Sequence, residues 1–201
     1  MRNFPNRFYA PFFSPQWDSS GTNTVRGHSF NPNGTIDNTE GFGAFDDLAL
    51  EQFRGCRNID IGGGKFDDNT HYLKKKFGID NYVYDPFGRT KNHNQAVLRL
   101  ARQQPFHIAT SFSVLNVIDD AIIRHQHITL VYNSIQQGGI AFFKIYSGNR
   151  SGRPTYSHEK YQSNRTASNY VAEISGVFGI QNVTLVAEKN LIIARKLMPK
   201  L

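Results

Sequence analysis

The most constraining feature of the sequence is a run of three glycines that joins a short apolar segment to a predicted helix. Residues 58–61 predict a buried strand, glycines 62–64 follow directly, and residues 67–77 predict a helix that Gly78 ends. Glycine-rich turns also serve as ordinary structural corners. Between a strand and a helix, however, such a loop lets the backbone approach a ligand closely and leaves N–H groups at the helix N-terminus free to bind it.

Strand and helix patterns alternate through the rest of the chain. Further strands are predicted at residues 82–85, 106–111 and 140–146, and further helices at residues 45–54, 93–104, 119–137 and 166–178. Residues 183–187 and 191–194 are short apolar runs separated by a polar turn, which predicts a hairpin. We therefore expect an α/β fold with a mostly parallel sheet of about six or seven strands that ends in an antiparallel hairpin, with helices on both faces.

Residues 1–43 do not follow this pattern and predict an irregular N-terminal arm in front of one domain over residues 44–201. The arm is rich in Asn, Gly, Pro and Ser, and its aromatic residues show no helical or strand period: Phe4, Phe8, Tyr9, Phe12, Phe13 and Trp17. A disordered tail is usually poorer in aromatic residues. We therefore expect much of the arm to lie against the domain, either as simple packing or as a lid over the site.

Bulk properties indicate a soluble protein of the cytoplasm without a membrane segment. No apolar run approaches the roughly 20 residues that a membrane-spanning helix needs. The N-terminus has no apolar stretch followed by a small-residue cleavage site, so no secretory signal is predicted. Cys56 is the only cysteine, so it cannot form an internal disulfide, which suits a reducing compartment. The oligomeric state is not indicated.

An acidic residue, Asp85, follows the second predicted strand about 20 residues after the glycine loop, as in nucleotide-binding folds. A triphosphate-binding loop would need Gly-Lys-Ser/Thr, but here Lys65 is followed by Phe66. A dinucleotide-binding loop would need a third glycine at the position of Asp67. The glycine loop therefore fits neither class. The Asp85 carboxylate can accept hydrogen bonds from two ribose hydroxyls, and Asp60 can face a ligand ammonium group. A nucleoside joined to an amino acid describes S-adenosylmethionine, which we predict as the cofactor.

Several motifs carry a resemblance to a known family. They are Asp60-Ile61-Gly62-Gly63-Gly64-Lys65-Phe66-Asp67, Tyr84-Asp85-Pro86-Phe87 and Ser113-Val114-Leu115-Asn116-Val117-Ile118, continued by Tyr146-Ser147-Gly148-Asn149-Arg150-Ser151-Gly152 and Asn190-Leu191-Ile192-Ile193-Ala194-Arg195-Lys196. On these motifs, residues 55–196 resemble class I S-adenosylmethionine-dependent methyltransferases, in particular a group of small bacterial and phage proteins. The resemblance implies the Rossmann-like methyltransferase fold and the transfer of a methyl group to an acceptor that it does not identify.

The resemblance also implies roles for single residues. The methionine part of the cofactor would be held by Asp60, Gly62, Gly63 and Gly64, the ribose by Asp85, the adenine by Pro86 and Phe87, and the floor near the methyl group by residues 111–116, among them Ser111 and Ser113. Two features depart from the family pattern. Phe66 replaces the usual third glycine of the loop, and one helix alone is predicted between Asp85 and Phe106, so we expect the family's third strand to be missing.

Candidates for the chemistry itself are few. Asn116 follows the third predicted strand, where its amide would orient an acceptor or cap a turn before the next helix. Methyl transfer is an in-line displacement, so positioning matters more than proton transfer. His125 and His127 would point about 200° apart on a helix and have no cysteine or acidic partner nearby in sequence, so we predict no metal site.

The acceptor is expected to meet the basic last third of the chain, where ten Lys and Arg stand against three Asp and Glu over residues 121–201. Residues 147–165 combine basic and aromatic side chains that suit phosphates and unstacked bases, and we predict acceptor contacts at Arg150, Arg153, Tyr156 and Tyr161. A nucleic acid or another phosphate-bearing molecule is therefore a possible acceptor; a solvated linker is the alternative for this segment. Two other functions stay open, a sulfonium-cleaving enzyme and a non-catalytic module that binds nucleic acid or a partner protein.

Overall fold

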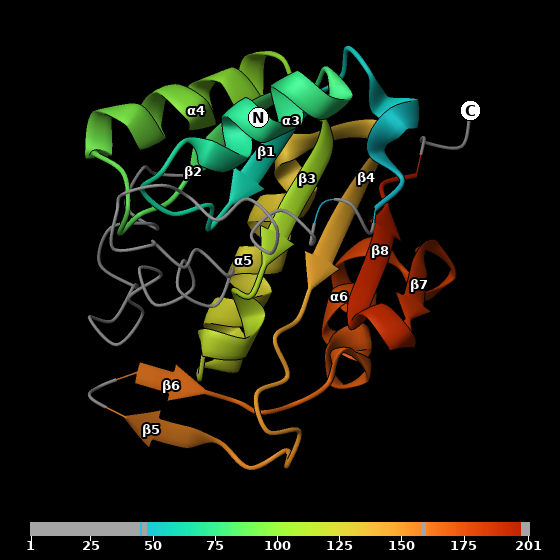
Figure 1. The fold of residues 1–201 in the computed structure, drawn as a ribbon. Helices are drawn as coiled ribbons and strands as arrows, with labels where there is room; N and C mark the ends of the chain where they lie inside the picture. Colours follow the sequence, from blue (N-terminus) through green and yellow to red (C-terminus); the bar gives the residue numbers. More distant parts are fainter. Residues whose placement is uncertain (1–44, 46–47, 158–159, 198–201) are drawn as a thin grey trace, which may run out of the picture.

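A six-stranded sheet forms the centre of the computed structural model, which describes residues 45, 48–157 and 160–197 (Figure 1). The arm predicted over residues 1–43 lies outside these residues. In spatial order the strands are β2 (Asp80–Tyr84), β1 (Arg57–Ile61), β3 (Phe106–Phe112), β4 (Ile135–Lys144), β8 (Leu191–Arg195) and β7 (Val183–Val186). The first four are parallel, and β8 is antiparallel to both β4 and β7. The predicted mostly parallel sheet with a final antiparallel hairpin is confirmed.

Helices cover the sheet unequally on its two faces. The helices are α3 (Asp68–Phe77), α4 (Lys91–Gln103), α5 (Ala121–Ser134) and α6 (Val171–Phe178). One hydrophobic core joins α4, α5 and α6 to the sheet, and a second joins α3 and the 3-10 turn η1 (Leu50–Phe53) to the opposite face. Neighbouring residues of β4 show this division, because Phe143 lies in the first core and Phe142 in the second. A single helix, α4, connects β2 to β3, so the family's third strand is missing, as predicted.

Local sequence signals account for the helix ends. Gly78 ends α3 in the left-handed conformation, with φ at 69°, and its N–H donates to the carbonyl of Lys74. The Thr90 side chain caps α4 by accepting the N–H of His93. Asp120 caps α5 by accepting the N–H groups of Ile122 and Ile123. The predicted glycine stop at Gly78 is thus observed, and the helix predicted from residue 119 begins after an acidic cap.

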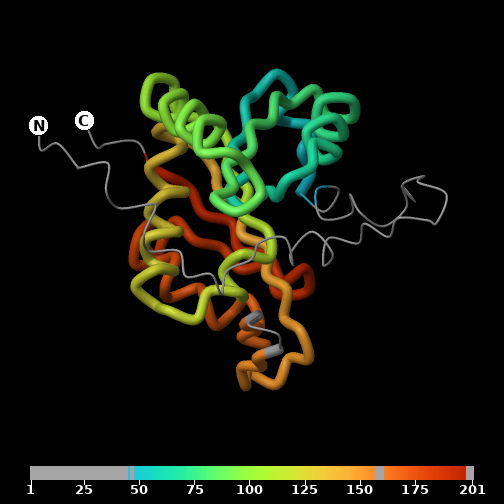
Figure 2. The backbone as a smooth tube through the Cα atoms, turned by 90° about the vertical axis from the view of Figure 1, so that its left-hand side faces the viewer, coloured from blue at the N-terminus to red at the C-terminus, as the bar shows by residue number. Residues whose placement is uncertain are grey.

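Three predicted elements were wrong in extent or type. The helix expected over residues 45–54 is not continuous: Phe45 is helical, Ala49 has φ at 50° and interrupts the segment, and the 3-10 turn η1 follows at Leu50–Phe53. The helix expected over 119–137 ends at Ser134, because Ile135 already pairs with Phe106 in the sheet and is fully buried. The expected polar loop over 147–165 contains an antiparallel hairpin, β5 (Thr155–Ser157) and β6 (Lys160–Gln162), that extends beyond the end of the sheet (Figure 2).

The structure bears on two of the predictions made from bulk properties, those on membrane segments and on Cys56. Across the described ranges, every helix is too short or too polar to cross a membrane. Cys56 is half-buried as a free thiol and packs against the core formed by α3 and η1. This environment fits a small packing residue.

Candidate functional site

The candidate site lies at the carboxyl ends of β1, β2 and β3. From β1 the chain passes to β2 on one side, and it later returns to β3 on the other side of β1. Open α/β sheets bind ligands at such a switch point, in the crevice outside the strand ends. The glycine loop follows β1, Asp85 follows β2 and residues 113–116 follow β3, so the fold brings three predicted segments to one edge (Figure 1).

The glycine loop fits tightly between β1 and the segment after β3. Gly62 has φ at 85°, and its N–H donates to the carbonyl of Tyr84 at 2.8 Å. A Cβ atom on Gly62 would collide with the side chain of Val114, and one on Gly63 would lie 2.6 Å from Asp60 Oδ2. The backbone path of the loop therefore requires glycine at both positions.

Asp85 ties the loop to the end of β2. Its carboxylate is fully buried; Oδ2 accepts the N–H of Gly64 at 2.7 Å, while Oδ1 accepts the N–H groups of Phe87 at 2.9 Å and Gly88 at 2.7 Å. The Asn94 side chain braces the same residue, because its Oδ1 accepts the Asp85 N–H and its Nδ2 donates to the Asp85 carbonyl. Both of the predicted adenine-side residues lie in this turn, where Pro86 is half-buried and the Phe87 ring is exposed.

Asp60 belongs to a row of buried polar side chains across β2, β1 and β3. Its Oδ1 accepts the hydroxyl of Thr110 at 3.0 Å, and Thr110 in turn accepts the Asn58 amide. Asn69 lies in the first turn of α3, and its buried Oδ1 has no hydrogen-bond partner among the residues that the structure describes. This part of the site therefore presents acceptor oxygens, which suits a ligand that carries hydrogen-bond donors.

Arg89 holds the glycine loop from the outside and was not predicted from the sequence. Its Nε donates to the Gly64 carbonyl at 2.8 Å, and its Nη2 donates to the Phe66 carbonyl at 2.8 Å and to Asp67 Oδ1 at 2.7 Å. The hydrogen bond from Arg89 lowers the pKa of the Asp67 carboxyl below its usual value. The same bonds fix the loop where Phe66 replaces the family's third glycine. The sequence signal that could have revealed this role is the position of Arg89, a basic residue four positions after Asp85.

The predicted residues after β3 have different environments. The Ser111 hydroxyl bonds Nε2 of His127 on α5 at 2.7 Å, and burial lowers the pKa of His127 to about 4. Ser113 has φ at 56°, an uncommon conformation for a residue with a side chain, and its N–H donates to the Lys144 carbonyl. The chain therefore places Ser111 against α5 and Ser113 at the strand ends.

Asn116 connects the strand ends to the β5–β6 segment. Its buried amide donates to Gln162 Oε1 at 3.0 Å and accepts the Tyr146 N–H at 3.3 Å, and its carbonyl accepts the Ser163 N–H. These bonds favour a structural role over the predicted orientation of an acceptor, which stays a prediction.

The four predicted acceptor residues all lie on or beside the β5–β6 hairpin. Tyr156 is 68% exposed and pairs with Tyr161 at a ring distance of 5.4 Å. Arg150 and Arg153 are exposed in the preceding segment, and Arg150 lines a shallow cavity of about 300 Å³ together with residues of two other segments: Thr166, Ala167, Ser168, Ala187, Glu188 and Asn190. The hairpin thus presents the aromatic pair, and the segment before it presents the two arginines.

The two histidines of α5 do not converge on a common ligand position. His127 is buried under β3, whereas His125 is exposed on the same helix. Over residues 45, 48–157 and 160–197, no group of three or more His, Cys, Asp or Glu side chains is arranged to hold a metal ion.

Comparisons with known proteins identify the fold. No model of a protein family matches the chain, and no curated protein matches its sequence. Among solved structures, the sugar N-methyltransferase KedS8 from Streptoalloteichus sp ATCC 53650 matches with a TM-score of 0.55 at 9% identity, over 98% of this chain and 99% of that one. The 1,6-didemethyltoxoflavin-N1-methyltransferase of Burkholderia thailandensis, solved with bound 1,6-didemethyltoxoflavin and S-adenosylhomocysteine, matches with a TM-score of 0.54 at 13% identity, over 94% of this chain and 93% of that one.

The chain has the class I methyltransferase fold. The sequence resemblance to this group is confirmed at the level of the fold, whereas the subgroup of small bacterial and phage proteins stays a prediction. Within the class I methyltransferase fold, the glycine loop, Asp85 and Asn116 stand at the carboxyl edge of the sheet, at the switch point described above.

Proposed function

We propose that this chain is an S-adenosylmethionine-dependent methyltransferase. The observation that carries the proposal is Asp85, a buried carboxylate at the end of β2 that lies within 2.7 Å of the glycine-loop N–H at Gly64. The two matching solved structures support it, because both are methyltransferases and one contains S-adenosylhomocysteine.

The residues present fit this cofactor in their chemistry. Ribose hydroxyls and an ammonium group are hydrogen-bond donors, and the strand ends offer the acceptor carboxylates of Asp85 and Asp60. Asp85 would hold the ribose. The ribose hydroxyls would compete with the three backbone N–H groups that already donate hydrogen bonds to this carboxylate. Asp60 and glycines 62–64 would hold the amino-acid part. Bound there, the cofactor supplies a methyl group on a sulfonium.

The chain's own contribution is to hold donor and acceptor in line. Arg89 and Asp85 fix the glycine loop, and Asn116 fixes the segment after β3 to the β5–β6 hairpin. Holding two reactants in a productive geometry removes much of the entropic cost of their encounter. His127 is a poor general base for this role, because its ring is buried against Ser111.

The proposed acceptor is a phosphate-bearing molecule, with nucleic acid the best fit. Arg150 and Arg153 offer two exposed cations in the segment before the hairpin, and the hairpin carries the Tyr156–Tyr161 pair, in which Tyr156 is exposed. Cations track a phosphate backbone, while aromatic rings stack on unpaired bases.

A non-catalytic module is the second candidate, and the hydrogen bonds of Asp85 are the observation that favours it. Three backbone N–H groups use this carboxylate to close the loop, and Phe66 stands where the family has glycine. A scaffold that keeps the fold but uses its ribose-binding acid structurally would bind a partner without transferring a methyl group.

Product analysis separates these functions. The full chain is incubated with S-adenosylmethionine and RNA or DNA oligonucleotides, and the nucleoside products are identified by mass spectrometry. S-adenosylhomocysteine together with a methylated oligonucleotide supports the proposal. Methylthioadenosine with homoserine lactone indicates sulfonium cleavage instead. Absence of S-adenosylmethionine binding by calorimetry contradicts both enzyme functions, and oligonucleotide binding in that case supports the module.

A further inference from the structure

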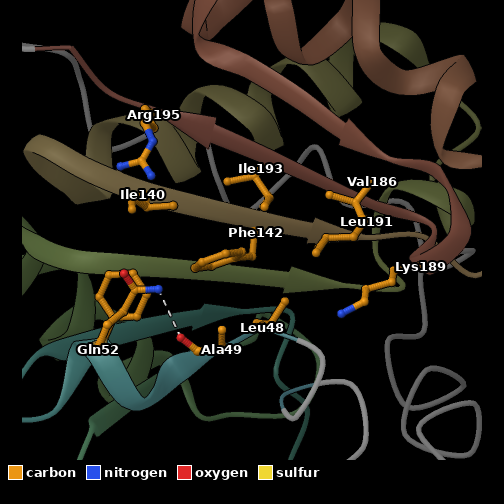
Figure 3. A pocket seen from close by; sticks show the side chains of 11 residues that line it. Leu48, Ala49, Gln52, Ile140, Phe142, Val186, Lys189, Leu191, Ile193 and Arg195 are labelled. Atoms are coloured by element: carbon orange, nitrogen blue, oxygen red, sulfur yellow. Dashed lines mark hydrogen bonds between the residues drawn. The ribbon is translucent and has the colours of Figure 1, made fainter.

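Tyr146 is a large exposed side chain at the end of β4. Along this strand, Ile140 and Phe142 point to the sheet face that η1 borders (Figure 3), whereas Phe143 lies in the core with α5 and α6. Directly after the strand, Ile145 is still buried in that core at 4% exposed, and Tyr146 follows it at 45% exposed. The exposed tyrosine therefore stands at the carboxyl edge of the sheet, where the candidate site lies.

Hydrogen bonds hold the Tyr146 backbone on both sides. Its N–H donates to Asn116 Oδ1 at 3.3 Å, and its carbonyl accepts Gln162 Nε2 at 3.1 Å. Asn116 Nδ2 donates in turn to Gln162 Oε1 at 3.0 Å, so the three hydrogen bonds form a closed ring through both side-chain amides. This amide ring fixes the point from which the Tyr146 side chain extends. A side chain whose backbone is held before binding loses less conformational entropy when a ligand orders it.

The amide ring joins three segments around the candidate site. Asn116 belongs to η2 (Leu115–Val117), which follows β3. Gln162 is the last residue of β6, and Tyr146 leads from β4 into the segment before the β5–β6 hairpin. Through these bonds, Tyr146 is tied both to the strand ends and to the hairpin that carries the tyrosine pair. It therefore lies between the two parts of the proposed site.

We infer that Tyr146 contacts the acceptor and that its ring stacks on a planar, unpaired base. This inference rests on the proposed function, because it names a residue that binds the proposed acceptor. Among the described residues, the Tyr146 ring forms no aromatic or cation–π pair, and the residue is exposed, so a stacking face is available. Every base has a face that can stack on an aromatic ring. Arg150 and Arg153 follow in the same segment and offer cations for the phosphates.

Oligonucleotides that contain 2-aminopurine test this contact, because the fluorescence of this base is quenched when it stacks. The base is placed at each position of a single-stranded oligonucleotide in turn. The full chain is compared with Tyr146→Ala, with Tyr146→Phe, which keeps the ring, and with the control Ile180→Ala. Ile180 is an apolar residue of η4 (Ile180–Asn182) that is 78% exposed. Anisotropy measures oligonucleotide affinity, calorimetry measures S-adenosylmethionine binding, and circular dichroism checks the fold.

Tyr146→Ala should weaken oligonucleotide binding about tenfold and should lose the quenching at one position of the strand. Tyr146→Phe should keep both, and all variants should bind S-adenosylmethionine as the unmodified chain does. Equal affinity and quenching in Tyr146→Ala and Ile180→Ala would overturn the inference, as would a Tyr146→Phe variant that binds as weakly as Tyr146→Ala. Absence of oligonucleotide binding by the unmodified chain also overturns it.

The same measurements separate this contact from the proposed function. Oligonucleotide binding that depends on the Tyr146 ring, in a chain that does not bind S-adenosylmethionine, supports the contact and contradicts the methyltransferase function. Methyl transfer to an oligonucleotide, together with normal oligonucleotide binding by Tyr146→Ala, contradicts the contact alone.

Discussion

The backbone N–H of Gly64 donates a hydrogen bond of 2.7 Å to Asp85 Oδ2, so the loop after β1 and the end of β2 are joined directly. The bond is buried and connects residues 21 positions apart. It makes the acidic residue predicted to bind a ribose also the residue that shapes the glycine loop. Cofactor affinity and loop geometry should therefore change together when Asp85 is replaced.

Asp85→Ala should weaken S-adenosylmethionine binding by more than about tenfold, or about 1.4 kcal/mol, because it removes the ribose acceptor and frees the loop. Calorimetry measures the affinity, and circular dichroism checks that the variant is folded. Asp80→Asn is the matched control, since Asp80 lies at the amino end of the same strand in an exposed pair with Lys74. Unchanged affinity in folded Asp85→Ala would show that the ribose assignment is wrong.

Arg89→Ala should also reduce cofactor affinity, although Arg89 is a positioning residue whose side chain bonds the loop carbonyls rather than the ligand. Arg89→Lys keeps the charge but not the forked geometry, so we expect it to restore little of the affinity. Hydrogen exchange of the loop amides should rise in both variants. Arg99→Ala, exposed on α4, is the control. Normal loop protection in Arg89→Ala would contradict this role.

Asn116→Ala should lower the free energy of unfolding by about 1–3 kcal/mol, because it leaves the buried groups that its amide now bonds without partners. Urea unfolding measures the loss, with the exposed Asn92→Ala as a comparison. A variant of normal stability with a reduced kcat and an unchanged KM would instead support the predicted orientation of the acceptor by Asn116.

The burial of His127 predicts that the fold weakens in mild acid. Burial lowers its pKa from 6.5 to about 4, so the folded state binds fewer protons than the unfolded state between these values. The free energy of unfolding therefore keeps its full value above pH 6.5 and decreases as the pH falls towards 4. Between pH 7.5 and 5 the decrease is about 2 kcal/mol. Urea midpoints at the two pH values test this. His127→Gln should show a smaller difference, and an equal difference in both proteins would assign the pH effect elsewhere.

Arg150→Glu and Arg153→Glu should weaken oligonucleotide binding and lower its salt dependence by about one unit of slope for each phosphate that an arginine no longer neutralises. Binding is followed by fluorescence anisotropy over a range of salt concentrations. Arg102→Glu makes the same charge change at an exposed position of α4. If all three variants weaken binding equally, general charge rather than the hairpin attracts the oligonucleotide. Affinity for S-adenosylmethionine should stay unchanged throughout.

Much of the site was predictable because its signals are local. The glycines are required by backbone conformation and close packing at Gly62 and Gly63, and Asp85 follows its strand at the spacing that the fold needs. Arg89 and Asn94 were missed, since their roles consist of hydrogen bonds to segments that only the folded chain brings near. The early start of β4 was missed for the same reason, because Ile135 is a strand residue through its pairing with Phe106.

By itself, the sequence determined the α/β plan, the glycine loop, the acid after β2 and the closing hairpin, since hydrophobic periodicity and the conformational limits of glycine act over a few neighbouring residues. The tertiary structure alone decided what those residues do once together. It turned Asp85 into the acceptor of three backbone N–H groups, gave Arg89 the loop to hold and paired residues 155–157 with residues 160–162. These features depend on interactions between distant segments, whose energies no local pattern contains.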